Sequence, residues 1–390
     1  KKAEIIILAL LLLMSLITRI LFADFITNDY LEFLSVWCKE YKAGSIGDAM
    51  RSNISNYMPA YNYFLILFSR TPLNDLYEIK LLSIIFEILT AFLIIKVASY
   101  VLKKPCSPIY FGAILLCGVF LTDSAVWAQC DSIYTFFGLL GFYYALKKKS
   151  IRSFICFGLS ISFKMQALLL YPVVLVLLLN KEPKYLKWKD ILVVPVVFVL
   201  VNIVPFFFGR SLWDIYSIYL KQSSTYPELS KNCANFAVFF SLFKKGQIGY
   251  YIALILLILL TLSYLVFIYY FVIKKLKANA TLSINDFILI AFCFCFGVVF
   301  LMPKMLDRFL YFAIVFSIIY AIINKNNRSV LICLCLNVGV LTTFMQYLKT
   351  MPINIAPINA LFATAAFFIL MHEFYLQIIK NQANNNIISI

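Results

Sequence analysis

The chain has 390 residues, of which 63% are hydrophobic and 13% are charged, and its formal net charge is +16. A soluble domain is nearer half apolar and about a quarter charged. One core cannot bury this much apolar surface, so lipid must cover part of it. The positive charge does not indicate a nucleic-acid partner, because the lysines and arginines form short clusters between apolar runs, as the positive-inside rule expects. The sequence therefore predicts an all-α, polytopic integral membrane protein, with one membrane domain over residues 1–390.

A spanning helix needs about 20 mostly apolar residues. This length, applied along the chain, predicts about twelve spanning helices, several of them short. No small-residue cleavage site follows the first segment, which favours an uncleaved helix over a signal peptide. The predicted segments are 4–23, 79–102, 109–126, 132–147, 151–164, 166–180, 190–208, 248–273, 285–302, 309–323, 329–347 and 358–379.

Two ionisable residues stand near the end of the first segment. Arg19 lies inside the apolar run, about one turn from its outer end, where it needs a polar partner or must snorkel to the interface. Asp29 follows the segment directly. Its functional interpretation is a general base that deprotonates an acceptor hydroxyl as the hydroxyl attacks a sugar. The alternatives are a solvated loop acid or a cap for the helix that starts at Leu31.

Two long outer loops are expected, over residues 24–78 and 209–247. The residue pattern of the first loop predicts an amphipathic helix that lies in the membrane interface. The aromatic residues over 56–69 of the same loop also suit the interface. Loops this long in a compact membrane protein are usually functional. The apolar face of the predicted amphipathic helix consists of Phe33, Leu34, Trp37 and Tyr41.

A polar junction follows the third segment, with the sequence Trp127-Ala128-Gln129-Cys130-Asp131. Together, Trp, Gln and Asp side chains are the groups that stack on sugars and hydrogen-bond to them. The alternatives are that Trp127 anchors the chain in the interface and that Asp131 caps the helix beginning at Ser132.

Two further junctions carry cations. Phe163-Lys164-Met165-Gln166 places Lys164 between two apolar runs, where it either snorkels to the interface or meets a phosphate. Residues 302–311 read Met-Pro-Lys-Met-Leu-Asp-Arg-Phe-Leu-Tyr and include Lys304 and Arg308. Arginine suits bidentate phosphate contacts, whereas an exposed Asp307–Arg308 pair would contribute little.

The cysteines and the single histidine give no sign of a metal site. Most of the ten cysteines lie in apolar runs, where cysteine acts as a small hydrophobe. The pairs Cys293/Cys295 and Cys333/Cys335 are spaced i, i+2 and point to different sides of a helix, which disfavours a metal or disulfide role. With His372 alone, a zinc site built from histidines is excluded.

Lysine and arginine set the expected orientation. They cluster over 147–152, 181–189 and 274–277 and near both ends, which predicts that both termini face the cytoplasm. Most acids, including Asp29 and Asp131, fall on the opposite side with both long loops. The expected location is the inner, or plasma, membrane, with the active site on the periplasmic or extracellular side.

In order along the chain, these motifs resemble those of the multi-spanning glycosyltransferases of the GT-C class, over residues 15–312. Such enzymes carry an acid in the first outer loop, here Asp29 followed by Tyr30. The group that includes GPI mannosyltransferase-like enzymes and bacterial relatives has Trp-x-Gln-x-Asp and Phe-Lys-x-Gln elements, met by residues 127–131 and 163–166. Its late Pro-x-Met-His-Glu-Arg-Tyr element is met in part by residues 303–309. Leu306 stands where the histidine would be, which removes one possible phosphate or hydroxyl ligand, and Asp307 replaces the glutamate.

The resemblance implies an inverting transfer of a hexose from a polyprenyl-phosphate donor to a surface glycan or lipid-linked acceptor. It implies Asp29 as the base and Lys164, Lys304 and Arg308 as cations that neutralise the departing phosphate. No nucleotide or other cofactor is expected, and a divalent cation at Asp29 is an alternative. The last helices, over 309–390, are the variable part of such enzymes. The side chains implied in sugar or acceptor binding are Tyr30, Trp127, Gln129, Asp131, Gln166 and Asp307.

Two other functions fit a chain of this kind. A transporter or lipid flippase would also have about twelve helices and buried charges, but would more often show repeated halves and broken helices near mid-membrane. An O-antigen polymerase or ligase usually has arginine-rich outer loops, whereas Arg51, Arg70 and Arg210 are scattered here. Loops rich in Lys and Asn, with abundant Ile, suggest an AT-rich bacterial gene. The expected reaction is therefore decoration of an O-antigen or wall polymer with glucose from undecaprenyl-phosphate-glucose.

Overall fold

The computed structural model describes residues 2–223, 227–243, 246–278, 281–350 and 355–380. The chain divides into two compact units, each described here by itself. The first comprises Lys1–Lys96, Pro105–Leu168 and Lys187–Thr225, and the second comprises Val97–Lys104, Leu169–Leu186 and Tyr226–Ile390.

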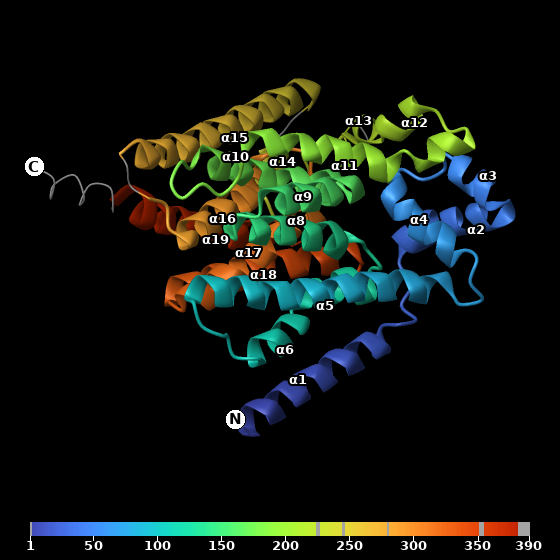
Figure 1. Cartoon of the computed structure of the whole chain (residues 1–390), viewed down its shortest axis with the longest axis horizontal. Coiled ribbons are helices and arrows are strands. Elements are labelled where there is room, and N and C mark those ends of the chain that lie inside the picture. Colours follow the sequence, from blue (N-terminus) through green and yellow to red (C-terminus); the bar gives the residue numbers. More distant parts are fainter. Residues whose placement is uncertain (1, 224–226, 244–245, 279–280, 351–354, 381–390) are drawn as a thin grey trace, which may run out of the picture. The chain divides into compact units, whose positions relative to one another are not determined.

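Most of the described residues are helical, which confirms the all-α prediction (Figure 1). Within them, the strands are β1 (Ser230–Lys231) and β2 (Met305–Leu306), which pair in parallel in the second unit.

The first unit holds the elements from the first predicted span to the second outer loop. Its elements are α1 (Lys2–Leu21), η1 (Tyr30–Leu34), α2 (Ser35–Ala43), α3 (Ile46–Arg51), α4 (Pro59–Phe68), most of α5 (Asp75–Leu102), α6 (Ile109–Leu115), α7 (Gly118–Leu121), η2 (Thr122–Val126), α8 (Asp131–Leu146), α9 (Ser150–Phe163), most of η3 (Met165–Leu170), η4 (Trp188–Leu192), α11 (Val193–Asn202), η5 (Val204–Phe208), α12 (Leu212–Tyr216) and α13 (Ile218–Ser223).

The second unit holds the C-terminal helices and the strand pair. Besides β1 and β2, its elements are α10 (Tyr171–Leu179), α14 (Ala237–Phe243), α15 (Gly246–Lys277), α16 (Ile284–Leu301), η6 (Asp307–Leu310), α17 (Tyr311–Asn324), α18 (Asn327–Tyr347), α19 (Ala356–Phe374) and η7 (Tyr375–Lys380). Residues 224–226 and 244–245 of the predicted second outer loop, and 381–390 of the variable C-terminal part, lie outside the described residues.

Each of the twelve predicted segments is helical, but the count of about twelve spans is not confirmed. Among the described residues, eight helices are long and apolar enough to cross a membrane, or nine if the bent pair Ile109–Leu115 and Gly118–Val126 is one span. The two parts of that pair meet at 46°. The rest fall short of the roughly 20 residues that a span needs, because α8 has 16 residues and α9 has 14. The long apolar helices are those of a multi-pass membrane protein.

The predicted amphipathic helix of the first outer loop is present as η1 and α2. Three of its four apolar-face residues are buried (Leu34, Trp37 and Tyr41), whereas Phe33 is exposed. The buried residues face protein, since α2 packs on α4. The apolar face of this helix therefore packs on other helices of the loop and does not rest in lipid alone.

Helices α8 and α9 are antiparallel, so the junction before α8 (127–131) and the junction after α9 (163–166) lie at the same end of the pair. The Ser160 hydroxyl donates to the Tyr134 carbonyl at 2.6 Å, which ties the helices together. Gly158 permits α11 to approach α9, because a Cβ at this position would lie 2.7 Å from Val197 Cβ. Since α8 begins where α9 ends, Asp131 and Lys164 are brought side by side.

Candidate active site after the first helix

The carboxylate of Asp29 lies against the 127–131 junction, which is about 100 residues away in sequence. Asp29 Oδ2 accepts hydrogen bonds from Trp127 Nε1 at 3.0 Å and from Gln129 Nε2 at 3.1 Å. Trp127 and Gln129 are buried, whereas Asp29 is half-buried and so remains accessible. Two buried donors therefore fix the direction of one accessible carboxylate.

This geometry excludes one alternative for Asp29, a helix cap, and the alternative for Trp127, an interface anchor. Asp29 precedes η1 without forming a side-chain cap hydrogen bond, so its carboxylate is not a helix cap. The indole of Trp127 is fully buried, so it is not an interface anchor.

Backbone conformation brings the two segments together. The Thr27 hydroxyl donates to the Trp127 carbonyl at 3.4 Å, and it accepts from the Tyr30 N–H at 3.3 Å. Between the two donors to Asp29, Ala128 has a φ of 61°, in the left-handed region that disfavours residues with a Cβ. This turn allows the Trp127 and Gln129 side chains to reach the same oxygen.

Asp131 and Lys164 form a buried ion pair. Lys164 Nζ lies 2.9 Å from Asp131 Oδ2, and the two side chains are 8% and 1% exposed. Asp131 begins α8, but its Oδ2 accepts from Lys164 and its Oδ1 accepts no hydrogen bond from a backbone N–H, so it does not cap the helix. Lys164 therefore neither snorkels nor stands open to a ligand, because its charge is shared with a buried carboxylate.

Tyr57, which the sequence placed only in an aromatic band, links these two contacts. Its hydroxyl donates to Gln129 Oε1 at 3.5 Å, and Lys164 Nζ lies 5.3 Å from the centroid of its ring. The rings of Trp37 and Tyr61 meet the Tyr57 ring edge-on at 5.4 and 5.3 Å. The aromatic residues over 56–69 could have been predicted to line the site, but sequence periodicity does not show which of their rings lies next to a cation.

The other predicted residues of the first unit lie differently. The Tyr30 hydroxyl donates to Asp75 Oδ1 at 2.8 Å and is buried. Burial, together with the Asp75 carboxylate, raises the pKa of Tyr30 well above its usual value, so the phenol stays protonated. Gln166 lies in η3, two residues after Lys164, and is half-buried.

The late motif belongs to the second unit, where the loop before α14 is hydrogen-bonded to it. Lys231 pairs with Leu306 in the β1–β2 register, and the Lys304 N–H donates to the Leu229 carbonyl at 2.8 Å. Asn235 Nδ2 donates to the carbonyls of Val299 and Met302, which end α16. Leu306, in place of the expected histidine, therefore takes part in a strand pair.

Asp307 and Arg308 do not form the exposed pair considered from the sequence. Asp307 is buried, and the Arg308 side chain is 14% exposed. Arg308 Nε lies 4.0 Å from Asp307 Oδ1, and the same oxygen accepts from the Arg308 N–H at 2.8 Å. The Arg308 guanidinium is thus held close to a carboxylate and mostly shielded from solvent.

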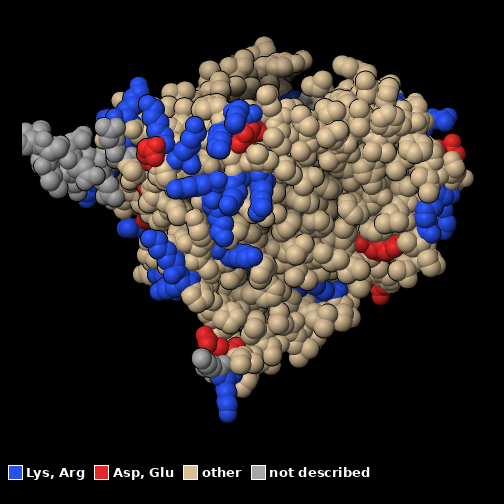
Figure 2. Space-filling model, in the orientation of Figure 1, with Lys and Arg blue, Asp and Glu red and all other residues tan. Residues whose placement is uncertain are grey.

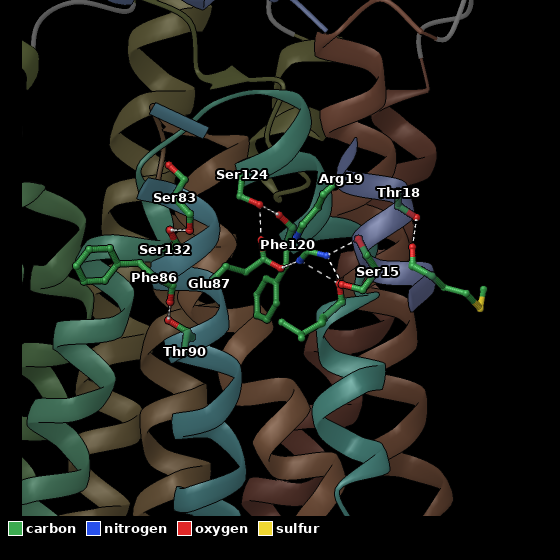
Figure 3. Close-up of polar contacts among 12 residues, drawn as sticks. Ser15, Thr18, Arg19, Ser83, Phe86, Glu87, Thr90, Phe120, Ser124 and Ser132 are labelled. Atoms are coloured by element: carbon green, nitrogen blue, oxygen red, sulfur yellow. Dashed lines mark hydrogen bonds and ion pairs between the residues drawn. The ribbon is translucent and has the colours of Figure 1, made fainter. Parts of the chain in front are cut away.

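The sequence did not reveal Glu87, the buried partner of Arg19. Both lie in predicted spans, and Arg19 Nη2 contacts Glu87 Oε1 directly (Figure 3). A useful signal was available, because an acid inside an apolar helix needs a cation at similar depth.

The donors around Asp29 do not suit a metal ion. Trp127 and Gln129 present N–H groups to the carboxylate, and an N–H group does not ligate a cation. Across the part of the chain that the structure describes, no three His, Cys, Asp or Glu side chains gather in a way that could hold a metal.

No protein-family model matches this chain, and no curated protein matches it either.

Proposed function

We propose that the protein is an inverting glycosyltransferase of the GT-C type. It moves a hexose from a polyprenyl-phosphate donor to a glycan or lipid-linked acceptor, at the outer face of the plasma membrane. One observation carries this proposal. The acid of the first outer loop and the Trp-x-Gln-x-Asp junction, far apart in sequence, meet through two hydrogen bonds to one accessible carboxylate.

Asp29 has the position and chemistry of a general base. An acceptor hydroxyl that attacks the anomeric carbon must lose its proton, and the Asp29 carboxylate takes it up. The new glycosidic bond forms as the bond from the anomeric carbon to the phosphate oxygen breaks, and the electron pair leaves with polyprenyl phosphate. Attack opposite the leaving group inverts the anomeric centre.

The cations have different parts in this proposal. Lys304 and Arg308, which flank the buried Asp307, stabilise the charge that grows on the departing phosphate. Lys164 is neutralised in its buried pair with Asp131. The buried Trp127 and Gln129 act on the site through Asp29, because their N–H groups orient its carboxylate. The resemblance implies the class of donor, a polyprenyl-phosphate sugar, and glucose carried on undecaprenyl phosphate is the donor expected for a bacterial chain.

The test is a transfer assay with the purified protein in nanodiscs. Polyprenyl-phosphate donors carrying labelled glucose, mannose or galactose are each offered with lipid-linked and polymeric glycan acceptors. We expect one donor to pass its label to one acceptor, with one free polyprenyl phosphate released for each sugar transferred. Label that stays on every donor, across the full panel, would contradict the proposal.

A further inference from the structure

The first helix is attached to its unit mainly through polar groups. Ser15 and Arg19 are the two buried residues of α1 (Lys2–Leu21). It packs on α6 (Figure 1). The two helices meet closely at Gly112, where a Cβ would lie 2.8 Å from Leu11 Cβ. Apolar side chains gain little from leaving lipid, so hydrogen bonds and close packing must fix the position of such a helix.

Arg19 joins α1 to two other helices at once. One guanidinium nitrogen, Nη2, contacts Glu87 of α5 and donates to the Leu115 carbonyl at 3.2 Å (Figure 3). The other, Nη1, donates to the Ser15 carbonyl at 3.0 Å and contacts the Ser15 hydroxyl. Leu115 is the last residue of α6, so Arg19 satisfies a carbonyl at the break before α7.

The second oxygen of Glu87 reaches the segment that carries the donors to Asp29. The Ser124 hydroxyl donates to Glu87 Oε2 (Figure 3). Ser124 lies in η2, and Trp127 follows η2 directly. One buried ion pair thus touches the helix that precedes Asp29 and the segment that precedes Trp127 and Gln129.

The exit of α1 is held by α5 as well, two turns from Glu87. Lys80 Nζ donates to the carbonyls of Phe22, Ala23 and Phe25 at 2.7, 3.0 and 2.7 Å. The Tyr77 hydroxyl donates to Asp24. Helix α5 is therefore the common support on which the last turn of α1 and the chain leading to Asp29 are fixed.

We propose that Arg19 and Glu87 are positioning residues, which set the distance between Asp29 and its two donors, Trp127 and Gln129. The consequence for catalysis rests on the proposed function, whereas the consequence for geometry does not. A pair that only stabilised the fold could be replaced by two apolar residues without moving Asp29. A positioning pair could not, because the Leu115 carbonyl and the Ser124 hydroxyl would lose the groups that hold their segments together.

The test uses the double variant Arg19→Met/Glu87→Leu, which leaves no lone buried charge. Tryptophan is labelled with ¹⁵N, and the Trp127 indole resonance is assigned with Trp127→Phe. We expect this resonance to move toward its position in Asp29→Ala, which has no acceptor for the Trp127 indole, while those of Trp188 and Trp213 stay in place. We expect transfer to fall by about 10²-fold, because misplacing a reacting group by about 1 Å costs that much.

The matched control is Lys275→Met/Asp286→Leu, which removes a buried pair in the second unit, 3.1 Å apart. It should leave the Trp127 resonance unchanged. A Trp127 resonance that keeps its wild-type position in the Arg19/Glu87 double variant would overturn the proposal.

If that variant does not fold, Glu87→Gln serves as a second test. A partial shift of the Trp127 resonance supports the proposal, and an unshifted resonance overturns it. If wild-type protein transfers no sugar but the resonance shifts, the proposed function fails and the positioning role stands.

Discussion

At the scale of residues, the buried pair of Asp131 and Lys164 should be sensitive to the loss of one member. Lys164→Met leaves Asp131 uncompensated, with its side chain 1% exposed. Breaking a buried pair in this way costs about 3–5 kcal/mol, whereas replacing both members by apolar groups of similar volume is often neutral. We expect Lys164→Met to lower the apparent Tm in detergent markedly, and Lys164→Met/Asp131→Leu to restore much of it. Equal Tm values for the single variant and wild type would contradict a buried ionic contact.

Arg308 offers a second test of a single side chain. Arg308→Ala removes a guanidinium that the proposed mechanism places against the donor phosphate. A hydrogen bond to a charged group contributes about 1.5–3 kcal/mol, so we expect transfer to fall about 10- to 100-fold. The control is Arg51→Ala in the first outer loop, where Arg51 is exposed and donates to the Phe208 carbonyl at 3.0 Å. If Arg308→Ala and Arg51→Ala transfer sugar equally well, Arg308 is not in the site.

At the scale of elements, close packing of α9 against α11 should limit what residue 158 can be. A Cβ at Gly158 would lie 2.7 Å from Val197 Cβ and 3.1 Å from the Val194 carbonyl oxygen. Overpacking typically costs about 1–3 kcal/mol, more than alanine gains over glycine within a helix. Gly158→Ala should therefore lower the apparent Tm. Gly47→Ala is the control and should be neutral or mildly stabilising, because its Cβ would have no neighbour nearer than 3.4 Å.

The sequence predicted the elements well and their contacts less well. The twelve helical segments follow from apolar length, which lipid dictates residue by residue. The direction of the Asp29 and Asp131 side chains does not follow from it. The alternative that each acid caps the helix after it does not hold for either residue. Contacts with residues 98 and 33 positions away took over, since a buried indole and a buried ammonium each need a partner.

The same limit explains why Glu87 and Tyr57 were missed. Glu87 sits in an apolar helix with no polar neighbour in sequence, and only the fold brings Arg19 to it. Tyr57 belongs to an aromatic band whose members all look alike, although one of them lies beneath the Lys164 ammonium. The charges inside the predicted spans would have indicated that Arg19 pairs with Glu87. They would not have indicated the hydrogen bond from Ser124 to Glu87.

At the scale of the whole molecule, charge distribution predicts how the protein lies in the membrane. Figure 2 shows lysines and arginines gathered in a patch, with broad uncharged surface beyond it. Within the first unit, Asp131 begins α8 and Lys147 follows its end, about 24 Å apart at 1.5 Å per residue. Asp131 and the lysines at positions 147–149 therefore lie at opposite ends of one helix. The positive-inside rule predicts that the Lys147 end faces the cytoplasm.

Cysteine labelling in intact cells checks this orientation. In a background without the partly exposed native cysteines, Ser45→Cys should react with an impermeant maleimide, and Lys189→Cys should react only after permeabilisation. Ser45 and Lys189 are both exposed in the first unit. The reverse pattern would move the site to the cytoplasmic face.

The central claim is that Asp29 accepts a proton during sugar transfer, and Asp29→Asn tests it most directly. Asparagine keeps the size of the side chain and can still accept from Trp127 and Gln129, but it cannot take up a proton at neutral pH. The control is Asp24→Asn, since Asp24 is exposed and bonded to Tyr77. In the purified system, loss of a general base should lower the rate of transfer about 10²–10⁴-fold, with donor binding retained and Asp24→Asn close to wild type. Transfer by Asp29→Asn at the wild-type rate would contradict the account.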